Sequence, residues 1–324
     1  MSQLLTYVEI DGTTILAGRA YVSLRRGRLT STFSYDDAYL ALPSAYELDP
    51  ELPLTVGQLA VSSPLPRAFL DAAPDRWGRN LIRRQALLEG KQSLDERDYL
   101  LGVGDLGRQG ALRFKLDESG PFRSPLPDIP KLIDLPRLLD AATLVAQDAA
   151  AHPDAVKLLL DVGSATLGGA RPKALVRDAD RLYLAKFPQP QDRYDVVVAE
   201  HNCLALAAEC GIDVAPHRLV SVSGAQVLLE ERFDRHHGQR VGYLSALTLL
   251  RANDGDRYDY LDIAEEMARV SVQPSADLEQ LFRRAAFSYL VNNTDDHLRN
   301  HGMLRAKHGW RLAPAFDLNP DPDT

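Results

Sequence analysis

The sequence predicts an α+β fold in three parts: a small β-rich N-terminal region, a mixed α/β region and a helical C-terminal region. In residues 4–42 apolar and polar side chains alternate, which is typical of antiparallel strands with one buried face. Residues 173–231 contain short strand-like runs around one helical run, and residues 275–289 follow an amphipathic helical pattern. We therefore place the three parts at residues 1–120, 121–233 and 234–324.

The N-terminal part begins with the alternating run Leu5 to Ile10, followed by the turn signal Asp11-Gly12, with Gly18 and Gly27 further on. From 64 to 88 the pattern becomes helical. Trp77 lies between charged residues near a helix start, and composition favours a packing anchor over a ligand contact. The stretch 121–136 is rich in Pro, Asp and Arg, and it predicts a connector into a helix over about 138–150.

The middle part predicts two strands over 174–177 and 182–187, joined by the polar turn 178–180. A helix over 193–210 should start at Asp192 or Asp195 and end at Gly211. Glu200 falls on its apolar stripe, and a buried carboxylate requires a cation. Strands over 217–222 and 226–231 follow. The last helix has Ser275 as a plausible N-cap and an apolar stripe made of Leu278, Leu281, Phe282, Ala285 and Tyr289.

Composition narrows the class of protein. With 45% hydrophobic and 25% charged residues, the chain is an ordinary globular sequence. Neither a signal peptide nor an apolar run near the ~20 residues of a membrane span is evident, so we expect no membrane and a cytoplasmic location. A formal charge of -8 argues against sequence-independent binding of DNA over a broad surface. Cys203 and Cys210 lie two helical turns apart, too far for a disulfide, and are interpreted as small core residues.

The most informative stretch is 293–300, followed by Asp317. It places Asp295, then Asn300, then a second carboxylate after an apolar helix, which is the order that phosphoryl transfer requires in protein kinases. The same residues could form a solvated cap, and His297 with His301 could suggest zinc by their spacing. No third zinc ligand is arranged nearby, so the kinase interpretation is favoured.

Upstream, Gly168-Gly169 lies one strand before Lys186. Such a pair is ordinarily a turn, and the P-loop spacing is absent, but backbone amides here could approach phosphate oxygens. A lysine on an apolar strand is usually solvated. Glu200 on the next helix offers a partner that would hold Lys186 inward, as the strand lysine and helix glutamate of kinases do.

These residues resemble the HipA family of toxin-type serine/threonine kinases, over nearly the whole chain. The resemblance is carried by residues 74–79, 110–114, 168–173, 231–235, 292–300 and 315–318. It implies a protein-kinase-like fold with a mixed small lobe and a helical large lobe, preceded by a HipA N-terminal-like domain. Family members usually continue with several helices beyond the position of Asp317, whereas only seven residues follow it here. Either the large lobe is smaller than in the family, or the sequence is truncated at its C-terminus.

The resemblance also implies roles. Asp295 would be the catalytic base, Asn300 and Asp317 the magnesium ligands, Lys186 the phosphate-binding lysine and Glu200 its orienting partner. The remaining nucleotide contacts would be Gly168, Gly169, Ala170, Arg171, Pro172, Lys173, Glu231, Arg232, Phe233, His297 and Phe316. The family autophosphorylates a serine in the glycine-rich loop, and the matching position here is Thr166, with Ser164 two residues earlier.

The expected activity is transfer of phosphate from ATP, with Mg²⁺, to a protein hydroxyl. By resemblance the acceptor would be a translation factor such as an aminoacyl-tRNA synthetase, and the partner a HipB-like helix-turn-helix antitoxin through which DNA is contacted indirectly. Two alternatives stay open: a non-catalytic co-repressor or binding module acting with such an antitoxin, and a kinase acting on a small molecule or lipid.

Overall fold

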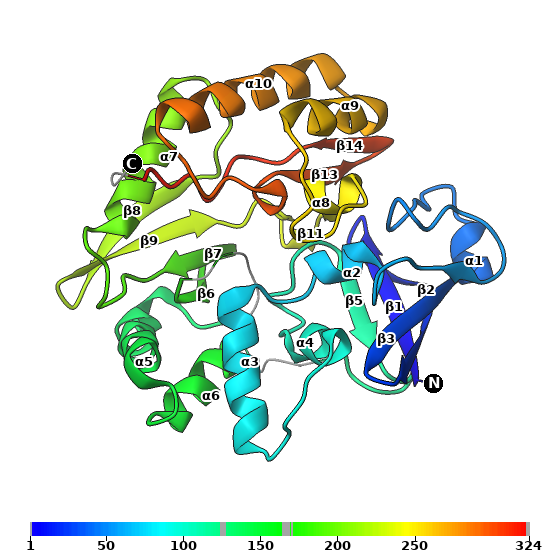
Figure 1. Ribbon diagram of the computed structural model, residues 1–324, viewed down its shortest axis with the longest axis horizontal. Helices are drawn as coiled ribbons and strands as arrows, with labels where there is room; N and C mark the ends of the chain where they lie inside the picture. The colour runs from blue at the N-terminus through cyan, green and yellow to red at the C-terminus, as the bar shows by residue number, and fades with distance from the viewer. Residues whose placement is uncertain (1, 124–127, 164–168, 170, 322–324) are drawn as a thin grey trace.

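The computed structural model describes residues 2–123, 128–163, 169 and 171–321, and it has the α+β architecture that the sequence predicts. Figure 1 shows two strand-rich regions, with helices packed between and above them. The N-terminal sheet has the order β4-β3-β2-β1-β5, with antiparallel pairing throughout. Its strands are β1 (Ser2–Ile10), β2 (Thr13–Arg25), β3 (Arg28–Tyr35), β4 (Leu59–Ala60) and β5 (Leu112–Lys115). The alternating pattern therefore identified the first three strands, although β3 ends at Tyr35 rather than near 42.

Gly18 is not a turn residue, unlike Gly12 and Gly27, which have positive φ angles at the ends of β1 and β2. It lies within β2, next to the register shift at Thr6 and Tyr7 of β1. A Cβ added at Gly18 would be 2.3 Å from the Ser34 carbonyl oxygen. The backbone of β2 at Gly18 therefore lies too close to β3 for any side chain.

Gly18→Ala is expected to lower the free energy of unfolding by about 1–3 kcal/mol, the usual cost of overpacking a well-packed core. Chemical denaturation monitored by circular dichroism measures it. Gly27→Ala is the comparison, because nothing lies within 4 Å of its added Cβ and only backbone strain of about 1 kcal/mol applies. Equal losses in the two variants would contradict the steric explanation.

A helical layer follows the sheet. Its helices are α1 (Asp37–Leu40), α2 (Arg67–Asp71), α3 (Arg76–Leu88), α4 (Glu96–Gly102), α5 (Leu135–Asp148) and α6 (Pro153–Asp161), with a 3-10 turn, η1 (Leu132–Asp134), before α5. The helical pattern over 64–88 is split into α2 and α3 around Pro74. Asp75 caps α3 by accepting a hydrogen bond from the Gly78 amide. Trp77 is buried in a cluster with α5 and α6, so the packing-anchor interpretation is confirmed.

The second sheet carries the predicted nucleotide lobe and has the order β6-β7-β9-β8. Its strands are β6 (Lys173–Asp178), β7 (Arg181–Lys186), β8 (His217–Val222) and β9 (Ala225–Glu231). Side chains of α5 cover one face, and side chains of α7 (Val196–Glu209) cover the other. Asp195 caps α7 as expected. Cys203 is buried in α7 but Cys210, just past its end, is exposed, so the core interpretation of Cys210 is wrong.

The C-terminal part contains α8 (Ala246–Leu249), α9 (Tyr260–Val270), α10 (Pro274–Leu290) and the turn η2 (Leu298–Asn300). It also contains the sheet β12-β13-β14, made of Tyr243–Ser245, Gly302–Ala306 and Gly309–Leu312, and the two-stranded ribbon β10-β11, made of Arg235–His236 and Gln239–Arg240. We predicted neither sheet, because their strands are too short for a periodic pattern to emerge.

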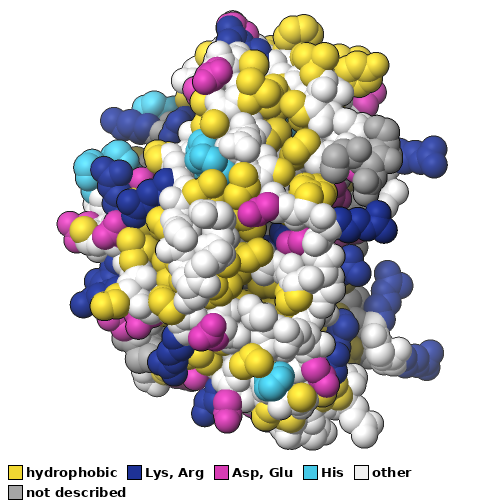
Figure 2. All heavy atoms as spheres, turned by 90° about the vertical axis from the view of Figure 1, so that its left-hand side faces the viewer, with side chains coloured by type: hydrophobic (Ala, Val, Ile, Leu, Met, Phe, Trp, Pro, Cys, Tyr) yellow, Lys and Arg dark blue, Asp and Glu magenta, His cyan; other side chains and the backbone are white. Residues whose placement is uncertain are grey.

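Two expectations for α10 are wrong. Its N-cap is Gln273 rather than Ser275. Phe282 and Tyr289 are 73% and 86% exposed, because the buried face of α10 includes the polar residues Asp277, Arg284 and Ser288. Hydrophobic side chains gather at the top of the face shown in Figure 2, at the height of α10. On the same face, basic and acidic side chains are interspersed.

The N-terminal sheet and the C-terminal part share one hydrophobic core. Phe33 and Phe69 belong to the same cluster as Met267, Met303 and Trp310. Across the residues described, no helix is long and apolar enough to cross a membrane.

Candidate active site

The predicted catalytic residues meet in one cleft. Its volume is about 1080 Å³, and its walls come from the N-terminal region, the β6-β7-β9-β8 sheet and the C-terminal part. Lys186, Asp295, Asn300 and Asp317 all line it. Four groups separated by up to 131 positions in the sequence are thus brought to one place.

Lys186 is the last residue of β7, and its side chain is buried. Its Nζ lies 2.5 Å from Glu200 Oε1, 2.8 Å from Asp317 Oδ1 and 3.1 Å from Glu230 Oε1. Burial alone would lower the pKa of Lys186, but the three carboxylates outweigh it and raise this pKa well above the ordinary value. The lysine is therefore held as a cation, facing inward.

Glu200 reaches Lys186 from α7, whose apolar stripe points at the sheet. Burial raises the pKa of Glu200, and the Lys186 cation opposes that rise. Glu230 lies on β9, diagonally across from Lys186, since Leu184 pairs with Glu230 and Lys186 pairs with Leu228. We had not predicted a role for Glu230. The sequence feature that could have indicated this role is a carboxylate directly after the apolar run Val227 to Leu229, in the same strand.

Asp317 follows β14 in a loop and has a left-handed backbone, with φ of 55°. Burial would raise the pKa of Asp317, but Lys186 first and Lys173 second hold it below its ordinary value. His297 also lines the cleft. An ionised carboxylate at this point is a suitable oxygen ligand for a hard divalent cation.

Lys173, at the start of β6, is buried, and its Nζ lies 2.7 Å from Asp75 Oδ2. A Cβ added at Gly169 would lie 3.2 Å from Lys173 Nζ and 3.4 Å from Asp317 Oδ2. Gly169 also has a φ of +97°, and its carbonyl accepts a hydrogen bond from the Trp77 amide at 3.4 Å. The end of the glycine-rich loop therefore lies between α3 and the Asp317 loop.

The charges of this cluster are unbalanced. Two lysines, Lys173 and Lys186, face four carboxyl groups from Asp75, Glu200, Glu230 and Asp317. Bringing so many carboxylates together in a buried place is costly unless further cations are present. A divalent cation beside Asp317 would reduce this excess.

The predicted catalytic loop runs from the end of α10 to η2. Asp295 is exposed in the cleft, and its backbone carbonyl accepts a hydrogen bond from Asn300 Nδ2 at 3.0 Å. This bond orients the Asn300 amide. Asn300 and Asp317 therefore supply an amide and a carboxylate oxygen. These donors fit Mg²⁺, which takes few protein ligands and completes its shell with water and phosphate.

Asp296 anchors this loop, a role that we did not predict. It accepts a hydrogen bond from the Tyr260 hydroxyl of α9 and lies 3.0 Å from His301 Nε2. Burial would raise the pKa of Asp296, but these partners outweigh it and lower the pKa. His301 is thus engaged with a carboxylate. Among the described residues no group of three His, Cys, Asp or Glu side chains is arranged to hold a metal ion.

Asp296→Asn is expected to lower kcat by about 10-fold or more with a smaller effect on KM for ATP, because it loosens the loop that positions Asp295. Steady-state kinetics measures both.

The same substitution gives a prediction for stability. Folding lowers the pKa of Asp296, so its ionised carboxylate adds to the free energy of unfolding of the unmodified chain above about pH 3.9, the ordinary aspartate pKa. This contribution is lost as the pH falls through the folded-state pKa. The stability difference between parent and variant should therefore shrink in acid; a constant difference from about pH 7 to 3 would contradict the assignment.

The predicted adenine hinge connects β9 to the C-terminal part. Glu231 and Arg232 line the cleft, but their side chains are engaged elsewhere. The Glu231 side chain pairs with Arg181 at 3.0 Å, and the Arg232 side chain is buried against Asp234. Phe233 packs with Phe316 at a ring distance of 5.4 Å, so these two aromatic side chains together provide an apolar surface suited to a flat base.

Two further residues predicted to contact the nucleotide, Arg171 and Pro172, are not part of the cleft lining. Arg171 forms a bidentate pair with Asp192 at 2.7 and 2.8 Å, and the Pro172 carbonyl accepts a hydrogen bond from the Phe187 amide. Gly168, Ala170 and the predicted phosphosites Ser164 and Thr166 lie outside the described residues.

Comparisons with known proteins agree on the family. The HipA-like C-terminal domain model matches residues 165–323, and the HipA N-terminal domain model matches residues 15–115. Two curated relatives carry the name Putative kinase. Y4mE of Sinorhizobium fredii is 30% identical over 148 residues, 42% of this chain and 33% of that protein. A protein of Haemophilus influenzae is 29% identical over 161 residues, 44% of this chain and 46% of that protein. The chain thus matches less than half the length of either relative.

Among solved structures, the HipA toxin of Shewanella oneidensis, in complex with HipB and operator DNA, superposes with a TM-score of 0.62. The match covers 98% of this chain and 76% of that chain at 16% identity, and at that identity it shows a shared fold. The chain has the two-part architecture of this fold class, an N-terminal β-rich domain joined to a kinase-like domain. It is a HipA-like protein, with both the N-terminal and the C-terminal domain of the HipA family.

Proposed function

We propose that this chain is an ATP- and magnesium-dependent kinase of the HipA type that phosphorylates serine or threonine hydroxyls of a protein. One observation carries the proposal: Lys186, Asp295, Asn300 and Asp317 line a single cleft. Each has the chemistry that phosphoryl transfer needs, and the cleft is large enough for a nucleotide and part of an acceptor.

The geometry of the cleft supports one role for each of these residues. Asp295, exposed beside the cleft, would accept or orient the proton of the acceptor hydroxyl. Lys186, held inward by Glu200, would neutralise negative charge on the nucleotide phosphates. Asn300 and Asp317 would hold magnesium, which would offset the negative charge of the nucleotide phosphates. Phe233 and Phe316 would pack against the adenine.

By family analogy we extend the proposal to autophosphorylation at Ser164 or Thr166 and to a translation factor such as an aminoacyl-tRNA synthetase as acceptor. We also propose a HipB-like antitoxin as partner, with DNA contacted through it, in the cytoplasm. The net charge of -8 supports indirect rather than direct contact with DNA.

Two measurements on the purified chain test the proposal. Calorimetric titration with magnesium-ATP should give saturable binding, whereas a non-catalytic co-repressor should give none. Mass spectrometry after incubation with ATP should find a phosphate on Ser164 or Thr166, as expected for a protein kinase and not for a kinase of small molecules or lipids. A chain that neither binds ATP nor transfers phosphate to itself or to any protein acceptor would refute the proposal.

A further inference from the structure

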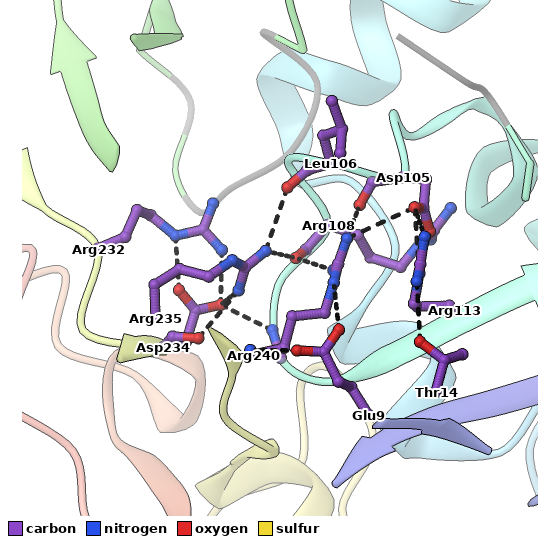
Figure 3. Close-up of polar contacts among 11 residues, drawn as sticks. Glu9, Thr14, Asp105, Leu106, Arg108, Arg113, Arg232, Asp234, Arg235 and Arg240 are labelled. Carbon is purple, nitrogen blue, oxygen red and sulfur yellow. Dashed lines mark hydrogen bonds and ion pairs between the residues drawn. The ribbon is translucent and has the colours of Figure 1, made fainter. Parts of the chain in front are cut away.

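A buried network of arginines joins the predicted adenine hinge to the N-terminal region (Figure 3). At its centre is Asp234, which follows the hinge directly and is 1% exposed. Its carboxylate accepts hydrogen bonds from Arg232 at 2.5 and 2.7 Å and from Arg235 at 2.9 Å. It also accepts one from the Gly110 amide of the N-terminal region at 2.8 Å.

The side chains of Arg232, Arg235 and Arg240 also donate hydrogen bonds to backbone carbonyls of the N-terminal loop 105–110. Arg232 donates to the Gly107 carbonyl at 2.9 Å, and Arg235 donates to the carbonyls of Leu106 and Arg108 at 3.2 and 2.8 Å. Arg240 donates to the carbonyl of Asp105 at 2.5 Å. We call this set, residues 232, 234, 235 and 240 with loop 105–110, the arginine joint.

Strands of the N-terminal sheet also contact the joint. Arg113 of β5 grips the Asp105 carboxylate, with its closest contact at 2.7 Å. Glu9 of β1 accepts a hydrogen bond from the Arg240 amide at 2.8 Å. The joint therefore connects the hinge to the N-terminal sheet through charge-assisted hydrogen bonds between mostly buried groups. Such networks are strong when complete and costly when one member is removed.

We infer that the arginine joint positions the hinge, so that the N-terminal region is a working part of the nucleotide site and Asp234 and Arg235 are positioning residues for adenine binding. The inference rests on the proposed function. Arg232 belongs to the hinge, and its side chain is fixed by Asp234 and Gly107. A shift of the joint would act first on the backbone beside Phe233, because the side chains of the joint make no hydrogen bond or ion pair with Lys186, Asn300 or Asp317 in the described part of the chain.

This separation gives a selective test. The full chain and its Arg235→Gln variant are titrated with three ligands: magnesium-ATP, adenosine and magnesium tripolyphosphate. The variant should weaken binding of ATP and adenosine by about tenfold, a modest effect for a misplaced contact surface. Binding of tripolyphosphate, which needs only the phosphate end of the cleft, should stay within about twofold. Arg235→Lys, which keeps the charge beside Asp234 but not the planar fork, serves if Arg235→Gln does not fold.

Two controls separate positioning from general destabilisation. Arg19→Gln breaks a 2.9 Å pair with Asp36 in the N-terminal sheet, away from the joint. Phe33→Leu loosens the shared core. Neither should change the ratio of adenosine to tripolyphosphate affinity. The inference is overturned if Arg235→Gln leaves adenosine binding unchanged, or if all three affinities fall together as in Phe33→Leu. A parent chain that binds none of the three ligands would instead overturn the proposed function.

Discussion

Asp295→Asn is expected to reduce phosphate transfer by about 10²- to 10⁴-fold, the range attributed to general acid-base catalysis. The amide keeps the shape of the side chain but cannot accept the proton of an acceptor hydroxyl. Asp295 is exposed, so the substitution should change stability by less than about 0.5 kcal/mol. Incorporation of labelled phosphate measures the rate, and calorimetry should show magnesium-ATP affinity within about twofold of the parent.

Asp256→Asn is the matched control for this variant. Asp256 is also an exposed carboxylate that lines the cleft, and an asparagine can still accept the hydrogen bond from the Asn253 amide. Its rate should stay near that of the parent. A rate for Asp295→Asn equal to that of Asp256→Asn would remove Asp295 from the catalytic role.

Lys186→Met is expected to have the largest effect on stability, a loss of about 3–5 kcal/mol, together with loss of phosphate transfer. The substitution leaves Glu200, Glu230 and Asp317 buried without their shared cation, and breaking a buried ion pair from one side typically costs this much. Urea denaturation measures the free energy of unfolding. The deficit should be smallest in acid, because unpaired carboxylates have a folded-state pKa above the unfolded value, and their penalty grows as pH rises through that range.

The control is Lys307→Met, which removes an exposed lysine in the turn between β13 and β14. It should change stability by less than about 0.5 kcal/mol. Adding Glu200→Gln to Lys186→Met should recover part of the lost stability, because one buried charge is removed. If the double variant is less stable than Lys186→Met alone, the electrostatic explanation is wrong.

The sequence by itself determined the local elements and part of the site. Alternation over residues 4–42 predicted a small antiparallel sheet, which corresponds to β1, β2 and β3, and Asp195 and Gly211 marked the two ends of α7. The helical period placed Glu200 on the apolar stripe of its helix, and the kinase pattern of a strand lysine with a helix glutamate then predicted that it meets Lys186. The order of Asp295, Asn300 and Asp317 indicated phosphoryl-transfer chemistry because it matches the order of the base and the metal ligands in protein kinases.

Only the tertiary structure decided which distant segments complete the cleft. Asp75 and Lys173 are 98 positions apart, and Arg235 meets the Leu106 carbonyl across 129 positions. No periodic pattern encodes such pairs, because they depend on how whole elements pack. Packing also decided that α10 turns Phe282 and Tyr289 outward while burying Asp277 and Arg284. A polar side chain with a well-placed partner can take a core position, and its partner is invisible in the sequence around it.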